Sequence, residues 1–502
     1  MISFDVFDTA LFREVYLPTD IFILIEKEVG NDFLKKRLEA EGKAVQRNKF
    51  YGLDAIYKFL PEFDKNVEIQ MELNNCKANP EILKIYDPNN CVFISDMYLP
   101  SSVIAQMLER CGYKDPKVFV SWEWKACKGD GALFKKVQKL LDKKIEKHYG
   151  DNYEADIEGA KKAGIPEVEF NPALHNIKKP IPAVKDPRLR KYMAEVICSN
   201  EISASEKAAI MVVPLVVGFT KWVLNQRKEG QKIFFLSRDM ITPYRVATEL
   251  LNAKDVYYLK ASRRSLSAAG LNSGDPRLIE KVRSVLSEEE IKKREKEGTT
   301  EVLKYLSRFD MKDGDIIADI GYSASIQAIL ESATGLKFNG LYMQICPSTL
   351  LDVQVLEYVK RRVIQYCLMI ETILGSDEDC IENYKDGEVI YKSEEAERKV
   401  LATFMNSIIM REAKKFVNWE LNLYDVEQAL IHLQYYPNDE MLQIFNKSIF
   451  SNREIGESII NFSKEKIKKG LLKETFRHSY ALRLFKRMLE ADPELSHLSR
   501  LI

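Results

Sequence analysis

Short apolar runs alternate with amphipathic stretches through the first 175 residues, and this alternation limits the folds that the chain can adopt. Runs typical of buried strands occur at residues 1–7, 91–97, 117–122 and 145–152. Stretches with helical periodicity follow the last three, at residues 101–112, 132–144 and 154–165. Repeated strand–helix units predict an α/β fold with a doubly wound parallel sheet, because a helix carries the chain back before the next parallel strand begins.

The composition is that of a large globular protein without a dominant charge. The chain has 502 residues, 46% of them hydrophobic, which predicts two or more domains. Its 75 basic and 75 acidic residues give a formal net charge of zero, which argues against a nucleic-acid partner. The eight cysteines form no CxxC pair and no secretory leader is recognisable, so we expect reduced thiols and a cytoplasmic location.

The longest apolar stretch and the richest proline segment outline the domains. Residues 208–219 are too few to span a bilayer, so we expect no transmembrane segment and a buried helix that kinks at Pro214. Residues 176–190 hold three prolines among mixed charges and are the best boundary candidate. The predicted organisation is an α/β domain at 1–178 with a helical insertion at about 14–88, a linker at 179–200, a second Rossmann-like α/β domain at 201–394, and a mainly helical region at 395–502.

Polar residues gather where the predicted strands end. They are Asp5, Asp8, Ser95, Asp96, Lys128, Asp151 and Asp156. The carboxyl ends of parallel strands meet at one edge of a sheet, so these side chains are expected to form one site. Several carboxylates with one lysine suit Mg²⁺ together with a phosphate, because Mg²⁺ takes oxygen ligands and keeps bound waters. The alternative for any single aspartate is that it caps a helix.

Four stretches together resemble the motifs of the haloacid dehalogenase superfamily. They are "FDVFDTAL", "VFISDMYLP", "KGDGALFKKV" and "YGDNYEADIEGAKKAGI", and they occur in the family's order over about residues 1–175. The helical insertion matches the cap that this superfamily often places between its first two motifs. A cap closes over a small substrate and excludes water.

The resemblance implies a role for each matching residue. Asp5 would be the nucleophile that forms an aspartyl-phosphate, and Thr9 sits at the family's position four residues later. Ser95 and Lys128 would hold the phosphoryl group, with Lys125 as the alternative lysine. The metal ligands would be Asp5, the backbone carbonyl of Phe7, Asp151 and Asp156, and Asp96 and Thr9 would contact substrate.

Phe7 departs from the family pattern, which usually has a second aspartate there as general acid and base. Proton transfer of this kind typically contributes about 10²–10⁴-fold to the rate. Three alternatives remain open: a leaving group that needs no acid, substitution by Asp8 or a cap residue, or a domain that binds its ligand and turns it over slowly. Because Asp151 is present, phosphate chemistry is favoured over carbon–halogen cleavage.

The second half repeats the strand-end pattern. Ser237, Arg238 and Asp239 follow one apolar strand, Arg263 follows the next, and Gly321 and Ser323 lie between a strand and a helix. Small residues before a helix let an anion approach backbone N–H groups, so a second phosphate site is one interpretation. The other is that the basic residues lie on the surface and the serines cap a helix.

The whole chain is similar to a group of two-domain predicted hydrolases found with bacterial surface-polysaccharide synthesis. The resemblance implies a phosphohydrolase or phosphotransferase for a sugar phosphate or a nucleotide-sugar-related compound. The alternative is a weakly hydrolytic or non-hydrolytic N-terminal domain that serves a C-terminal sugar or phosphosugar transferase. The sequence does not specify the substrate or the oligomeric state.

Overall fold

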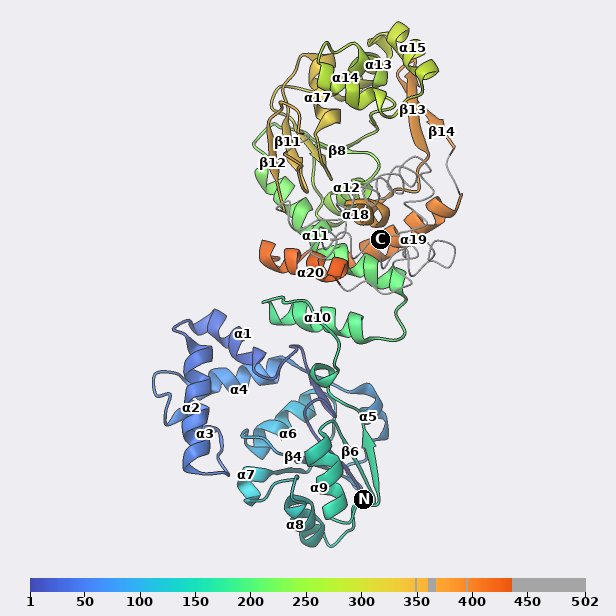
Figure 1. The fold of residues 1–502 in the computed structure, drawn as a ribbon. Helices are drawn as coiled ribbons and strands as arrows, with labels where there is room; N and C mark the ends of the chain where they lie inside the picture. The colour runs from blue at the N-terminus through green and yellow to red at the C-terminus, as the bar shows by residue number, and fades with distance from the viewer. Residues whose placement is uncertain (348–349, 360–366, 394–395, 436–502) are drawn as a thin grey trace, which may run out of the picture. The chain divides into compact units, whose positions relative to one another are not determined.

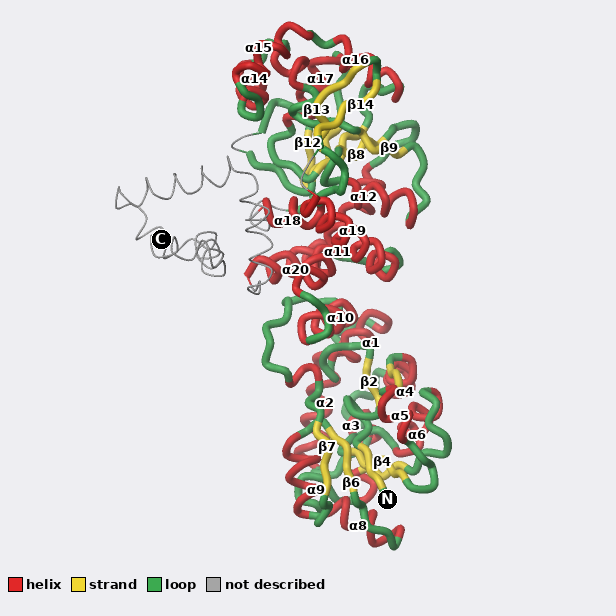
Figure 2. Tube along the Cα trace, turned by 90° about the vertical axis from the view of Figure 1, so that its right-hand side faces the viewer, coloured by secondary structure: helices red, strands yellow, loops and turns green. Residues whose placement is uncertain are grey.

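The computed structural model describes residues 1–347, 350–359, 367–393 and 396–435, and it divides into two compact units. They are Met1–Ser199 and Asn200–Ile502. Each unit contains a five-stranded sheet in which every neighbouring pair of strands is parallel, so the predicted α/β class is confirmed (Figures 1 and 2).

The sheet of the first unit has the order β5-β4-β1-β6-β7. Its strands are β1 (Ile2–Phe4), β4 (Cys91–Ser95), β5 (Val118–Val120), β6 (Lys147–Gly150) and β7 (Glu167–Phe170). The helices that follow these strands or flank the sheet are α5 (Pro80–Ile85), α6 (Ser101–Arg110), α7 (Ser121–Trp124), α8 (Ala132–Leu141) and α9 (Gly159–Lys162). The chain moves from β1 outward to β5 and then returns to β6 on the other side of β1. The switch point, where open α/β sheets bind ligands, therefore lies between β1 and β6.

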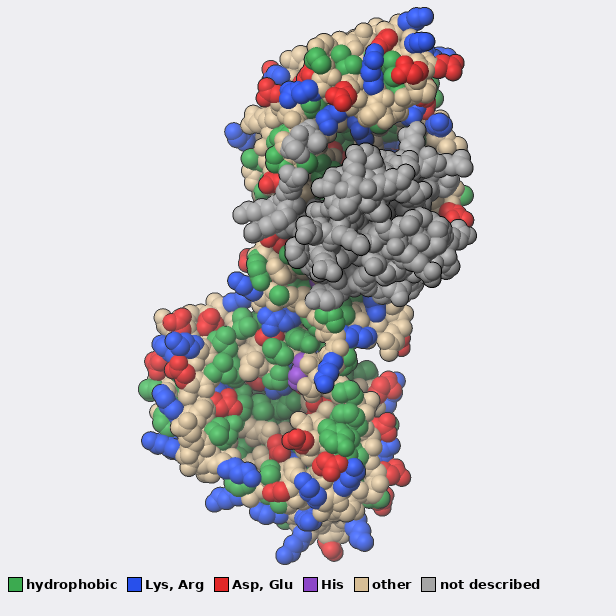
Figure 3. Space-filling view, in the orientation of Figure 1, with side chains coloured by type: hydrophobic (Ala, Val, Ile, Leu, Met, Phe, Trp, Pro, Cys, Tyr) green, Lys and Arg blue, Asp and Glu red, His purple; other side chains and the backbone are tan. Residues whose placement is uncertain are grey.

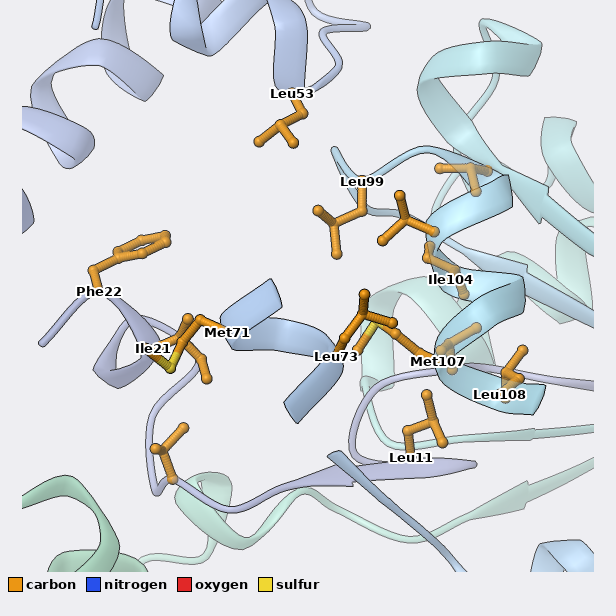
Figure 4. Close-up of a cluster of buried hydrophobic side chains, with 14 of the residues drawn as sticks. Leu11, Ile21, Phe22, Leu53, Met71, Leu73, Leu99, Ile104, Met107 and Leu108 are labelled. Atoms are coloured by element: carbon orange, nitrogen blue, oxygen red, sulfur yellow. The ribbon is translucent and has the colours of Figure 1, made fainter. Parts of the chain in front are cut away.

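Both faces of this sheet are buried, since every residue of β4 is buried and its side chains point alternately to the two faces. Phe93 belongs to the core cluster shared with α6, whereas Val92 and Ile94 pack in the cluster with α8. Successive side chains of a strand point to opposite faces, so one strand contributes to two cores. Figure 4 shows part of the first cluster, in which Leu73 lies toward Met107 of α6 and Met71 lies on the other side of its helix, toward Ile21.

The predicted helical insertion is a group of helices entered and left through a short β-ribbon. The helices are α1 (Asp20–Val29), α2 (Phe33–Arg47), α3 (Leu53–Tyr57) and α4 (Lys65–Asn74) (Figure 1). The ribbon pairs β2 (Leu11–Arg13) with β3 (Cys76–Ala78) in antiparallel fashion. The backbone N–H of Asn79 donates to the carbonyl of Ala10 (2.8 Å), which extends this pairing toward the end of β1. We call the segment from α1 to α4 the cap.

Most of the predicted linker, residues 179–200, is helical. It contains α10 (Pro187–Cys198), whose Arg190 guanidinium donates to the carboxylate of Asp20 in α1 at 2.9 Å. The boundary between the two compact units lies between Ser199 and Asn200. Helix α10 is therefore part of the first unit.

The sheet of the second unit has the order β12-β11-β10-β8-β9. Its strands are β8 (Ile233–Leu236), β9 (Val256–Leu259), β10 (Ile316–Asp319), β11 (Asn339–Tyr342) and β12 (Val355–Glu357). A hairpin of β13 (Cys380–Lys385) and β14 (Glu388–Lys392) accompanies them. The helices are α11 (Ala204–Gln226), α12 (Ile241–Arg245), α13 (Ser267–Leu271), α14 (Pro276–Arg283), α15 (Glu288–Glu297), α16 (Thr300–Leu306), α17 (Ser325–Thr334), α18 (Cys367–Leu374), α19 (Ala396–Phe416) and α20 (Leu423–Tyr435).

Helix α11 contains the longest apolar stretch of the sequence and runs through Pro214. Within the part of the chain that the structure describes, it alone has the length and apolar composition to cross a membrane, and 78% of its most apolar window is buried inside the protein. It packs against α19 and α20. The expected helices of residues 395–502 are found up to Tyr435, and residues 436–502 lie outside the described part.

Candidate active site

The predicted site residues of the first unit meet at the switch point of its sheet. Asp5 follows β1, Ser95 ends β4, and Asp151 follows β6. The backbone N–H of Asp5 donates to the carbonyl of Tyr149 at 2.8 Å, which fixes the end of β1 against β6. Strand pairing therefore brings Asp5 close to residues that lie 90 and 146 positions further along the sequence.

Three carboxylates and one ammonium form the centre of the site. Oxygen atoms of Asp5, Asp151 and Asp156 lie within 4.8 Å of one another. The Lys128 ammonium is buried, contacts Asp5, and lies 2.6 Å from Oδ1 of Asp156. Three ionised carboxylates around one lysine leave two negative charges uncompensated, and carboxylate oxygens are ligands that Mg²⁺ prefers. The residues present therefore fit a divalent cation.

Both oxygens of Asp156 are already occupied. Oδ1 accepts from Lys128 and lies 3.1 Å from Nε2 of His148, while Oδ2 accepts from the backbone N–H groups of Asp151 (3.1 Å) and Asn152 (2.9 Å). Burial alone would raise the pKa of Asp156, but Lys128 and His148 hold it below its ordinary value. Asp156 thus organises the lysine and the 151–152 backbone, which leaves Asp5 and Asp151 as the carboxylates better placed to bind an ion.

The other ionisable groups respond to the same surroundings. Burial raises the pKa of Asp5 well above its ordinary value, although Lys128 acts in the opposite direction. Burial, with Asp156 nearby, raises the pKa of Asp151 to about 6. The pKa of Lys128 is raised despite its burial, because Asp156, Asp5 and Asp96 surround it, so it stays an ammonium. A bound cation would stabilise the charged forms of Asp5 and Asp151.

Two glycines make room for this arrangement. A Cβ atom at Gly150 would collide with the carboxyl group of Asp156, and one at Gly159 would collide with the backbone carbonyl of Lys128. These glycines allow the segment of Asp156 and the loop of Lys128 to approach each other. Gly150 and Gly159, both in the fourth motif, are therefore needed because a side chain at either position would not fit.

A cavity of about 420 Å³ opens over the site. Its floor includes Asp5, Ser95, Lys128 and Asp151, and α1 and α2 contribute Phe22 and Glu41. The other lining residues are Phe7, Asp8, Arg13, Pro18, Thr19, Asp96, Met97, Tyr98, Asn152, Ala155, His175 and Asn176. In Figure 3 this unit has a hollow bordered by apolar and acidic side chains. The volume suits a small metabolite, because ligand pockets commonly measure about 300–1,000 Å³.

The structure discriminates between some of the sequence alternatives. Lys128 is buried in the site, whereas Lys125 is exposed. The Thr9 hydroxyl donates to Asp151 Oδ1 at 3.5 Å, and the Asp96 carboxylate accepts the backbone N–H of Lys128 at 3.0 and 3.1 Å. Asp96 therefore positions the lysine as well as lining the cavity.

Three residues around the site were not among the predicted site residues. His148 bridges Asp156 and Ser3 inside the sheet, and Ser3 is its neighbour in the pairing of β1 with β6. Arg13, ion-paired with Glu72 at 3.0 Å, lies 4.0 Å above the Phe7 ring. His175 lines the cavity from beyond β7, and no spacing in the sequence marks it.

The second unit also assembles polar groups at its switch point, between β8 and β10. Asp239 follows β8, Asp319 ends β10, and Glu371 lies in α18. Burial raises the pKa of all three acids. The pKa of Asp319 lies well above its ordinary value, and that of Glu371 is raised to about 7. The nearby charge of Asp239 further raises the pKa of Asp319 and of Glu371. Arg238 opposes the shifts of Asp239 and Glu371. Asp319 and Glu371 were not predicted.

The other predicted residues of the second unit have mixed placements. The Ser237 hydroxyl donates to the carbonyl of Ala261 (3.0 Å) and accepts its N–H (3.1 Å), so it ties the ends of β8 and β9 together. Arg263 is exposed and close enough to Glu371 to lower that group's pKa. Gly321 and Ser323 lie between β10 and α17, and a Cβ at Gly321 would collide with the carbonyl of Gln344.

Comparison with known proteins adds no assignment: no family model matches the chain, and no curated protein matches it.

Proposed function

We propose that the first unit is a Mg²⁺-dependent phosphohydrolase or phosphotransferase of the haloacid dehalogenase type, acting through Asp5 on a small phosphorylated metabolite. One observation carries the proposal: Lys128 contacts both Asp5 and Asp156 in a carboxylate cluster at the switch point of a parallel sheet. A nucleophilic carboxylate, a fixed ammonium and a cation-binding pair of acids together suit the transfer of a phosphoryl group.

The residues have distinct tasks in this proposal. Asp5 attacks phosphorus, the bond to the leaving oxygen breaks, and an aspartyl-phosphate forms, which water or a second acceptor then resolves. Lys128 remains an ammonium and neutralises charge on Asp5 and the phosphoryl oxygens. The Ser95 hydroxyl donates a hydrogen bond to one of those oxygens. Mg²⁺, held by Asp5 and Asp151, would supply further charge stabilisation when bound.

The direct test is phosphate release from sugar phosphates, nucleotides and acyl phosphates, measured with and without Mg²⁺. The wild-type chain is compared with Asp5→Asn and with Asp142→Asn, a matched change of an exposed aspartate at the end of α8. We expect Mg²⁺-dependent release that Asp5→Asn abolishes and Asp142→Asn retains. Release that survives in Asp5→Asn, or that ignores Mg²⁺ removal, would contradict the proposal.

The packing of Phe7 favours a second candidate. Its ring lies under Arg13 at the position where the family usually has a proton donor. In this candidate the first unit binds its ligand and turns it over slowly. It thereby serves the second unit, which is a sugar or phosphosugar transferase. Binding of a sugar phosphate by Asp5→Asn and wild type alike, without release of phosphate, would favour this candidate. In either case the resemblance of the whole chain to two-domain predicted hydrolases directs the panel toward cytoplasmic intermediates of surface-polysaccharide synthesis.

A further inference from the structure

A histidine with no hydrogen-bond partner lines the cavity above Asp5. Nδ1 of His175 is shielded from solvent and has no hydrogen-bond partner among the described residues, and the His175 side chain lines the cavity. Buried polar atoms in proteins are nearly always paired. An unpaired imidazole in a ligand cavity therefore indicates a partner that the chain itself does not supply.

The position of His175 is defined by the fold. It lies in a helical turn, Leu174–Asn176, beyond the carboxyl end of β7, the neighbour of β6 that leads to Asp151. The turn packs against α10, and the ring meets Tyr16 edge-on with 6.5 Å between centroids. His175 thus reaches the cavity from the same edge of the sheet as the carboxylates.

The remaining ionisable groups of the cavity are engaged elsewhere. Glu41 accepts from Arg37 (2.9 Å) and from the Tyr51 hydroxyl (2.8 Å). Asp96 accepts the backbone N–H of Lys128. Burial holds the pKa of Tyr98 well above its ordinary value, so its hydroxyl stays neutral and is a poor acid.

The basic groups of the cavity and Asp8 also have partners. Lys128 is fixed as an ammonium between carboxylates, and Arg13 is paired with Glu72. Asp8 interacts with Arg13, whose pKa it helps to raise, and it also borders a second cavity. His175 is left as the group best placed to transfer a proton.

We propose that His175 is the general acid and base of the Asp5 reaction, in place of the carboxyl group that Phe7 lacks. This inference rests on the proposed function. As Asp5 attacks, the bond between phosphorus and the leaving oxygen breaks, and its electron pair stays on that oxygen. The oxygen takes the proton from the imidazolium. In the second step the imidazole takes a proton from the attacking water, a bond forms between the water oxygen and phosphorus, the bond between phosphorus and Asp5 breaks, and the imidazolium is restored. Imidazole suits both steps because the same ring can release a proton and take one up.

The test is the dependence of kcat/KM on the leaving group. Wild type, His175→Gln and Asp8→Asn are assayed with aryl phosphates of graded leaving-group basicity, a simple alkyl phosphate and acetyl phosphate. We expect His175→Gln to lose about 10²–10⁴-fold on the alkyl phosphate, to show a steep dependence across the aryl series, and to keep turnover of acetyl phosphate, which needs no acid. Retained turnover of acetyl phosphate also shows that the variant is folded. Asp8→Asn should keep the shallow wild-type dependence.

Other outcomes overturn the inference in distinguishable ways. An equal loss on all substrates in His175→Gln assigns the residue to binding or structure. A steep dependence in Asp8→Asn alone assigns the acid to Asp8, and the proposed function stands in both cases. Hydrolysis of none of these compounds by wild type, or hydrolysis that survives Asp5→Asn, removes the proposed function and this inference with it.

Discussion

Replacing Glu68 by Gln should destabilise the cap by breaking a fully buried ion pair. Glu68 and Arg37 are both fully buried, and the guanidinium donates to the carboxylate twice, at 2.6 and 2.8 Å. The Tyr57 hydroxyl donates to the same carboxylate at 2.9 Å. The amide of Gln cannot neutralise Arg37, so the variant retains a buried cation that has lost its closest counter-charge.

The size of the effect follows from what Arg37 keeps. Removing one partner of a buried ion pair costs about 3–5 kcal/mol. Arg37 still has Glu41 at 2.9 Å, and it lies 4.5 Å above the ring of Phe22 and 4.8 Å above that of Tyr98. These contacts place the expected loss at the lower end, about 3 kcal/mol, or roughly a hundredfold in the local opening equilibrium.

Hydrogen exchange of peptides from α2, measured in the full chain, reports this opening directly. The matched control is Glu62→Gln, which breaks the exposed pair of Lys36 and Glu62 in the same cap, 3.5 Å apart. Exposed pairs contribute about 0–1 kcal/mol, so exchange in the control should change little. If α2 exchanges at similar rates in Glu68→Gln and Glu62→Gln, the reasoning about the buried pair is wrong.

Two further predictions address the site and the second unit. Gly150→Ala should abolish Asp5-dependent turnover, because the added Cβ displaces the Asp156 carboxyl group. The control Gly42→Ala lies in an open position within α2 and should raise the stability measured by thermal unfolding by about 0.5–1 kcal/mol. Turnover that persists in Gly150→Ala would refute the steric argument. Burial lowers the pKa of His432 to about 4, so the unfolded chain takes up a proton at higher pH than the folded chain does. The free energy of unfolding should therefore fall by up to about 3 kcal/mol as the pH drops from about 6.5 to 4. Urea unfolding should show that His432→Gln loses this pH dependence, and an unchanged pH profile in the variant would contradict the prediction.

The sequence predicted the elements that have strong periodicity and missed those that have little. Apolar runs located β1, β4, β5 and β6, although the strand predicted at 117–122 ends at Val120 and gives way to α7. Strand β7 was not predicted, because its side chains are mostly exposed at the sheet edge and carry no apolar signal. The β2–β3 ribbon was not predicted: β2 lies just before the predicted helical insertion and β3 inside it, and neither three-residue strand has an apolar run that marks it.

Site residues followed the same division. Those at strand ends, such as Asp5 and Asp151, could be predicted because topology alone brings them together. The partners of Asp156 could not be predicted, because they depend on side-chain directions and on the close approach that Gly150 permits. His175 comes from an irregular turn, where no periodicity exists to indicate which way a side chain faces.

The β2–β3 ribbon has a mechanical consequence. Both ends of the cap pass through it side by side, and the Asn79 side chain joins it to the carbonyl of Thr9 at 2.8 Å, four residues from Asp5. A two-stranded ribbon twists readily about its long axis but resists sliding, because sliding would break every ladder hydrogen bond at once. The ribbon therefore fixes the register in which the cap is attached to the sheet. Any displacement of the cap along the ribbon would reach the loop that carries Asp5 through Asn79 and Thr9.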